Sequence, residues 1–156
     1  MNNTLKFIVS IVIAELVGII GSFLTMPSIA GWYAYLVKPE IAPPNWIFGP
    51  VWTILFALMG IALFLIWKKG FDTRPAKIAL GIFSFQLALN LLWSIIFFYL
   101  NSPGAAFIEI ISLWLAILAT IISFAKISRP TVWLLLPYLL WVSFAGYLNF
   151  AIWQLN

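Results

Sequence analysis

The sequence predicts an all-α integral membrane protein: one domain over residues 1–156, a bundle of five transmembrane helices with a long structured first loop as its lid. Two observations predict the bundle. Of the 156 residues, 65% are hydrophobic and 8% are charged, whereas soluble domains average ~45–50% apolar and ~25% charged residues. Five apolar runs are each long enough to cross ~30 Å of hydrocarbon, which takes ~20 helical residues. Because the runs are continuous rather than alternating, they favour helices over barrel strands.

The first two spans flank the long loop. The first is predicted at residues 5–26, and it exceeds the ~7–15-residue apolar core of a signal peptide, so we expect an uncleaved helix. Pro27 and Gly31 are expected to end this helix. The second span is predicted at residues 46–67, after a Pro-Pro pair and before Gly70.

The last three spans are separated by short connections. The third is predicted at residues 78–100, the fourth at 105–125 and the fifth at 131–153. A Pro-Gly pair that begins at Pro103 makes the turn between the third and the fourth. Pro130 opens the fifth span at its first helical turn, where a missing N–H does no harm.

Positive charge is distributed unevenly along the chain. With five spans, the N-terminus, the second loop and the fourth loop share one side of the membrane. That side carries every Lys and Arg except Lys38. Since cytoplasmic loops are enriched in Lys and Arg, the sequence predicts an N-terminus inside and a C-terminus outside. The net charge of +4 is therefore a topology signal, and we expect no nucleic-acid partner.

Cysteine and histidine are both absent from the chain. Their absence excludes zinc fingers, disulfides, Cys nucleophiles, Ser-His triads and His-ligated haem. We therefore expect no metal site and no cofactor.

A few polar residues interrupt the apolar spans, where they usually face the bundle interior. Gln86, Asn90 and Trp93 share one face of the third span, either for hydrogen bonds between helices or for ligand contacts. Glu15 lies near the middle of the first span. Three roles are open for it: a ligand partner, a proton carrier, or a protonated acid bonded to a neighbouring helix. No Lys or Arg lies at its depth, and we expect the bonded acid. Glu109, near the outer end of the fourth span, is expected to be able to face solvent.

The first loop is unusually long and aromatic. It covers residues 27–45, and structureless loops beyond ~12–15 residues are usually functional or disordered. Three prolines stiffen the segment from Gly31 to Trp46, and four aromatic residues give it side chains to bury. Two interpretations remain open: a folded lid over the outer mouth of the bundle, or an aromatic belt at the headgroup level.

Small residues recur at four-residue spacing on three spans, which allows helix backbones to approach closely. Some of these stripes must hold the bundle together, and one is a candidate for a homodimer contact. The stripes are Ala14, Gly18 and Ser22; Ser84 and Ala88; and Ser112, Ala116 and Thr120.

Three blocks rich in Trp, Pro and Asn stand out: Trp32-Tyr33-x-x-Leu36-x-Lys38-Pro39-x-x-x-Pro43-Pro44-x-Trp46-x-x-Gly49-Pro50-Val51-Trp52, Gln86-Leu87-Ala88-Leu89-Asn90-x-x-Trp93 with Ile96-Phe97-Phe98, and Leu136-Pro137-Tyr138-Leu139-x-Trp141-x-x-Phe144-Ala145-x-x-Leu148-Asn149. In order, spacing and five-span layout, nearly the whole chain resembles the tryptophan-rich sensory protein/translocator protein family (TspO, peripheral benzodiazepine receptor). It departs from that family at Ile41, where many relatives carry Trp. No Lys or Arg follows Tyr147, so the proposed cholesterol motif is incomplete and specific sterol binding is not predicted.

The resemblance implies a pocket for porphyrins and aromatic drugs, capped by the first loop. By themselves, Trp52 with Phe56, and Trp141 with Ala145, each one helical turn apart, are equally consistent with plain helix packing. The resemblance favours a mainly apolar site with a few placed polar groups. The predicted ligand-binding residues are Tyr33, Pro43, Trp52, Phe56, Gln86, Asn90, Trp93, Trp141, Ala145 and Leu148.

Three functions follow as hypotheses. The first is a membrane binding protein for tetrapyrroles such as protoporphyrin IX, acting as sensor, carrier or scavenger. The second, implied by the resemblance, is an enzyme for light-dependent oxidative breakdown of porphyrin, with Trp52 and Trp141 as catalytic redox partners. The third is a transporter of porphyrins or of lipids and sterols, although no inverted repeat is visible. The resemblance also implies contact with membrane lipid, a homodimer, and a bacterial or archaeal cell membrane.

Overall fold

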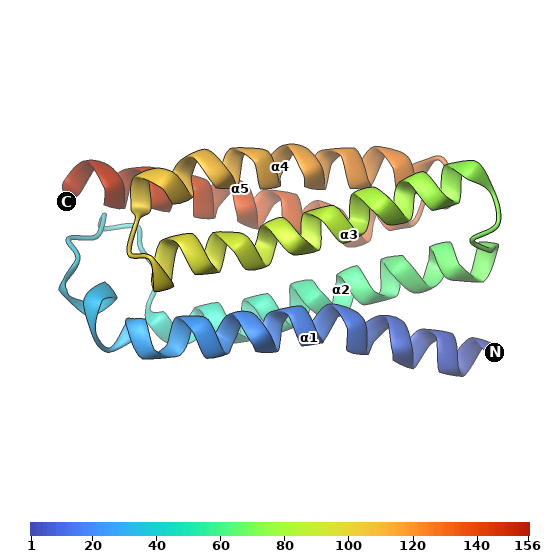
Figure 1. Ribbon diagram of the computed structural model, residues 1–156, viewed down its shortest axis with the longest axis horizontal. Helices are drawn as coiled ribbons and strands as arrows, with labels where there is room; N and C mark the ends of the chain where they lie inside the picture. The colour runs from blue at the N-terminus through green and yellow to red at the C-terminus, as the bar shows by residue number, and fades with distance from the viewer.

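The computed structural model describes residues 1–156 and confirms an all-helical protein. Five helices are long and apolar enough to cross a membrane, and they lie side by side along one long axis (Figure 1). The long helices are α1 (Asn3–Ile29), α2 (Phe48–Lys69), α3 (Arg74–Ser94), α4 (Pro103–Ala125) and α5 (Thr131–Leu155). The shorter elements are the 3₁₀-helices η1 (Trp32–Tyr35) and η2 (Asn45–Ile47) and the π-helix η3 (Ile95–Tyr99).

The two ends of the bundle differ in charge. The N-terminus lies at the same end as the α2–α3 and α4–α5 connections, and the C-terminus lies with η1 and the α3–α4 turn at the other end (Figure 1). All Lys and Arg residues except Lys38 therefore gather at the end that holds the N-terminus. The side of the membrane that this end faces stays a prediction.

Helix termini are capped by the residues that flank them. The side chain of Asn2 accepts a hydrogen bond from the Leu5 amide at 2.8 Å, and Thr73 accepts one from the Ala76 amide at 3.3 Å. Gly70 ends α2 with a φ of 103°, a conformation that residues with a Cβ rarely adopt. Gly70 and Thr73 thus set the two ends of the charged turn between α2 and α3.

The expected end of the first helix is wrong by a few residues. Pro27 lies inside α1, which continues to Ile29, and the Gly31 amide then closes a turn onto the Ser28 carbonyl at 3.2 Å. A proline in a helix removes one backbone hydrogen bond, to the residue four positions earlier. Near the end of a span this loss concerns a single carbonyl, so the helix can continue for two residues beyond Pro27.

α1 and α2 approach most closely at Gly60. A Cβ built on Gly60 would lie 2.7 Å from the Ile11 Cα and 3.0 Å from the Ser10 carbonyl oxygen. Only a residue without a side chain allows this backbone contact, as in close-packed membrane helices. The only buried residues of α1, Ser10 and Ala14, lie in its N-terminal half. The C-terminal half of α1 has no buried residue, although Gly18 there lies directly against the Phe56 ring.

The three small-residue stripes have different surroundings. On α1, Ala14 is buried and Gly18 faces the Phe56 ring, and on α4 the residues Ala116 and Thr120 are buried. These positions serve packing within the bundle. The exposed members are Ser22, Ser84, Ala88 and Ser112. No other part of the chain covers the α3 stripe, so a second copy could pack there. The homodimer stays a prediction.

Large apolar side chains cover the outside of the bundle. Phe23, Ile108 and Trp133 are among many that are more than half exposed. Monomeric soluble proteins rarely expose apolar surface on this scale. Such an apolar surface is suited to contact with lipid. Each helix also satisfies its own backbone hydrogen bonds, which the hydrocarbon region requires.

Candidate ligand cavity

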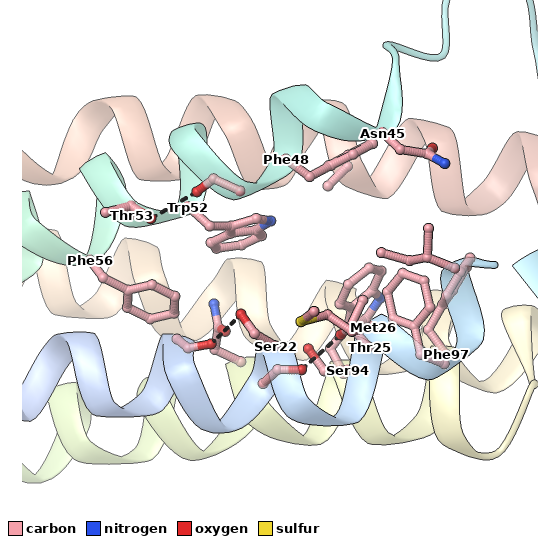
Figure 2. Close-up of a pocket in the computed structure, with 18 of the residues that line it drawn as sticks. Ser22, Thr25, Met26, Asn45, Phe48, Trp52, Thr53, Phe56, Ser94 and Phe97 are labelled. Carbon is pink, nitrogen blue, oxygen red and sulfur yellow. Dashed lines mark hydrogen bonds between the residues drawn. The ribbon is translucent and has the colours of Figure 1, made fainter.

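A cavity of about 420 Å³ lies between α1, α2, α3 with η3, and α5. No residue of α4 lines it. Figure 2 shows Trp52 and Phe56 projecting from α2 towards Ser22 and Thr25 of α1. The volume and the mainly apolar lining of the cavity are those of a typical small-molecule site, which spans ~300–1,000 Å³.

Most of the predicted ligand-binding residues line this one cavity. Pro43 and Gln86 are the two that do not: Pro43 lies in the first connection, and Gln86 is fully buried one turn below Asn90. The predicted residues that the structure brings together are Tyr33, Trp52, Phe56, Asn90, Trp93, Trp141, Ala145 and Leu148. Their contact with a ligand stays a prediction.

A chain of hydrogen bonds explains why Gln86 lies outside the lining. Asn90 Nδ2 donates to the Tyr138 hydroxyl at 2.7 Å, and that hydroxyl donates to Gln86 Oε1 at 2.9 Å. Gln86 Nε2 in turn lies 3.8 Å from the Met59 sulfur. The two amides of α3 therefore make the hydrogen bonds between helices that the sequence left open. Sequence reasoning missed Tyr138, whose hydroxyl in an apolar span was the available signal.

Asn149 holds the cavity wall together near the end of the bundle that carries the C-terminus. Trp93 Nε1 donates to Asn149 Oδ1 at 2.9 Å, and Asn149 Nδ2 donates to the Pro103 carbonyl at 2.7 Å. These two bonds connect α3, α5 and the start of α4. They fix the Trp93 ring, which stacks on Phe97 with 5.1 Å between ring centroids.

The π-helix η3 is a second feature that sequence reasoning missed. A continuous helix was expected to residue 100, but the Leu100 amide donates to the Ile95 carbonyl at 2.9 Å, five residues back. A π turn holds one extra residue, so it changes the direction of the side chains that follow, and such turns are frequent at functional sites. Here it places Phe97 and Phe98 in the cavity lining.

The first connection packs onto the bundle through Tyr33. The Tyr33 ring is buried with its centroid 5.6 Å from that of Phe98, and Lys38 Nζ lies 4.5 Å from the Tyr33 centroid. Burial raises the pKa of the Tyr33 phenol, so this residue stays neutral at physiological pH. By contrast, Tyr35 and Trp46 are 87% and 73% exposed. Trp32 also packs on the bundle, with its ring centroid 5.6 Å from that of Phe97, so the connection has two packed aromatic side chains and two outward ones.

The C-terminal residue anchors the same connection. Asn156 Oδ1 accepts a hydrogen bond from the Val37 amide, and Asn156 Nδ2 donates to the Val37 carbonyl, both at 2.9 Å. We expect Asn156→Ala to increase amide hydrogen exchange at Val37 by about fivefold or more, since each lost bond is worth ~0.5–1.5 kcal/mol. Gln154→Ala, at an exposed side chain of the same helix, is the control. Unchanged exchange in Asn156→Ala would contradict this anchoring.

Several polar side chains that line the cavity have no partner in the protein, among them Trp141, Glu15, Asn45 and Ser94. Trp141 Nε1 is buried without an acceptor. Glu15 lines the cavity and takes part in no hydrogen bond or ion pair. The expectation of a Glu15 carboxyl bonded to a neighbouring helix is therefore wrong, because the cavity lies where that neighbour would have to be.

Glu109 also differs from expectation. It is 8% exposed, and neither of its carboxylate oxygens has a partner. It lies two turns inside α4, on the stripe with Ala106 and Leu113 that faces the bundle interior, so it cannot face solvent. Glu109 does not line the cavity. No cluster of three or more acidic residues that could hold a metal ion is present.

Known proteins resemble this chain over most of its length. Residues 10–154 match the model of the TspO/MBR family. The chain is 46% identical over 156 residues to the tryptophan-rich protein TspO of Archaeoglobus fulgidus, with 99% of each chain covered. It is 47% identical over 140 residues to the protein of the same name from Chlorobaculum tepidum, covering 90% of this chain and 89% of the relative. It is 40% identical over 126 residues to the human translocator protein, covering 80% and 75%.

Proposed function

Because the chain belongs to the TspO/MBR family, we propose that it is a membrane binding protein for flat hydrophobic ligands, with tetrapyrroles such as protoporphyrin IX as the ligand class. The observation that carries the proposal is the cavity itself. Trp52 of α2 and Trp141 of α5 both line it, and Ala145 lies one turn from Trp141. Indole rings beside a small residue offer broad aromatic faces and a gap for a planar ring.

The surroundings of the cavity support a hydrophobic ligand that arrives from the membrane. Most lining residues are apolar, and the few polar ones are largely engaged within the protein. Met26 and Trp46 line the cavity and are also 66% and 73% exposed. The cavity is therefore open at this edge, and a ligand larger than its enclosed volume can extend past these side chains.

The first connection fits the role of a lid. It is aromatic and proline-rich, it is attached to the C-terminus through Asn156, and it contributes Tyr33 to the cavity lining. With the basic end of the bundle in the cytoplasm, the connection lies on the outer side of the membrane. In this arrangement a ligand is held under Tyr33 in the outer half of the bilayer.

The test uses the absorbance of protoporphyrin IX itself, so that loss of a Trp side chain does not alter the readout. We expect the wild-type chain in detergent to shift the porphyrin spectrum saturably. The double variant Trp52→Ala/Trp141→Ala should bind at least about tenfold more weakly, since each aromatic contact is worth ~0.5–1.5 kcal/mol beyond its buried area. Trp133→Ala, on an exposed ring outside the cavity, is the matched control. Equal affinity of the double variant and the wild type would refute the site.

A further inference from the structure

Glu15 is the only acidic or basic residue that lines the cavity. It lies near the middle of α1, whose 27 residues cross the bundle from end to end. The Lys and Arg residues lie near or beyond the helix ends or in the connections, with Lys6 two and a half turns away along α1. The chain therefore holds no cation at the depth of Glu15.

Several neutral polar side chains of the cavity are paired within the protein, whereas those of Asn45 and Ser94 make no hydrogen bond. Ser22 donates to the Gly18 carbonyl at 2.9 Å, and Thr25 and Thr53 donate to carbonyls four residues back at 2.8 and 2.9 Å (Figure 2). Asn90 and Asn149 belong to the networks described above. Glu15 differs from all of these side chains in being a carboxyl, and no group of the protein pairs with it.

An acidic side chain inside a bilayer is costly, and such residues usually pair or mark a ligand path. A carboxylate in such a setting is stabilised by an opposite charge that meets it with good geometry. No side chain of this protein supplies that charge at Glu15, so a cationic group on a ligand that enters the cavity is the available partner.

We propose that Glu15 is a specificity-determining residue, which makes the cavity prefer planar aromatic ligands that carry a protonated nitrogen at the Glu15 end. The proposal rests on the proposed function of the cavity as a ligand site. Ligand N–H groups donate to the Glu15 carboxylate while the aromatic ring lies between the walls. A tetrapyrrole dicarboxylate satisfies the same rule only when its carboxylate edge points away from Glu15.

Glu109 provides a matched control for this idea. It is a second carboxyl at bilayer depth without a partner, but it lies on α4, which contributes nothing to the cavity. Glu15→Gln and Glu109→Gln each replace a carboxyl by an uncharged amide of the same size. Only the first should change ligand preference.

The experiment uses two isosteric probes, 9-(aminomethyl)anthracene, a cation at neutral pH, and 9-ethylanthracene, which is neutral. Binding to the full chain in a nonionic detergent is measured by energy transfer from Trp to anthracene. We expect the wild type and Glu109→Gln to bind the cation about tenfold more tightly, as a hydrogen bond to a charged group is worth ~1.5–3 kcal/mol. In Glu15→Gln the two probes should bind equally, because the amide no longer pairs with the cation.

Three results would overturn the inference. The wild type binds the neutral probe but shows no preference for the cation; Glu15→Gln keeps the preference; or Glu109→Gln loses it as fully as Glu15→Gln does. In each case the neutral probe still reports a working cavity, so the proposed function stands. If neither probe binds the wild type saturably, the proposed function of the cavity fails together with the inference.

Discussion

Gly60→Ala is expected to destabilise the bundle by about 3 kcal/mol, because overpacking a tight contact costs ~1–3 kcal/mol and here the obstacle is backbone. The added Cβ would lie 2.7 Å from the Ile11 Cα and 3.0 Å from the Ser10 carbonyl oxygen. A flexible side chain could rotate away from a new methyl group, but these atoms move only if α1 as a whole moves. The α1–α2 contact should therefore widen, and with it the wall of the cavity that α1 provides.

The matched control is Gly81→Ala on α3, where a Cβ would meet nothing within 4 Å. Alanine is favoured over glycine in a helix by ~1 kcal/mol, so this variant should be neutral or slightly more stable. Both variants are compared with the wild type by unfolding in a titration of sodium dodecyl sulfate followed by circular dichroism. Equal midpoints for the Gly60 and Gly81 variants would show that the α1–α2 contact is looser than the structure describes.

Tyr138→Phe is expected to have the second-largest effect, a loss of about 2 kcal/mol of stability. The Tyr138 hydroxyl accepts from Asn90 and donates to Gln86, and all three side chains are buried. Removing this oxygen leaves an amide N–H and an amide oxygen without partners in a region that excludes water, at ~1–3 kcal/mol for each unsatisfied group. Partial rearrangement of the two amides recovers some of this cost, as hydrogen bonds between membrane helices average ~0.6 kcal/mol in one measured bundle.

Tyr147→Phe is the control for this substitution. Tyr147 lies on the same helix, is 54% exposed and takes part in no hydrogen bond. The same unfolding titration should separate the two variants clearly, with Tyr147→Phe close to the wild type. If both variants shift the unfolding midpoint equally, the hydrogen bonds of the Tyr138 hydroxyl add no stability beyond that of an unbonded tyrosine hydroxyl on α5.

The five helices, their order and the charge difference between the ends of the bundle were predictable from sequence. Hydropathy and length decide whether a segment crosses a bilayer, and both are properties of the segment alone. Eight of the 27 residues that line the cavity were also predictable, because their motifs resemble those of a known family, whereas most of the lining from α1 was not. Pro27 shows the limit of local rules: proline weakens a helix there, but the surrounding span continues.

Only the tertiary structure decided which groups meet inside the bundle. Asn90 lines the cavity, whereas Gln86 lies outside the lining and accepts a hydrogen bond from Tyr138. Glu109 is buried in the bundle interior, whereas Glu15 lines the cavity without a partner. Apolar residues surround each helix on all sides, so the sequence of one helix indicates only weakly which face turns inward. The packing of helices at Gly60, the π turn of η3 and the hydrogen bonds of Tyr138 settle these orientations. Sequence by itself therefore determined that the chain spans the membrane, and packing between spans decided which side chains form its site.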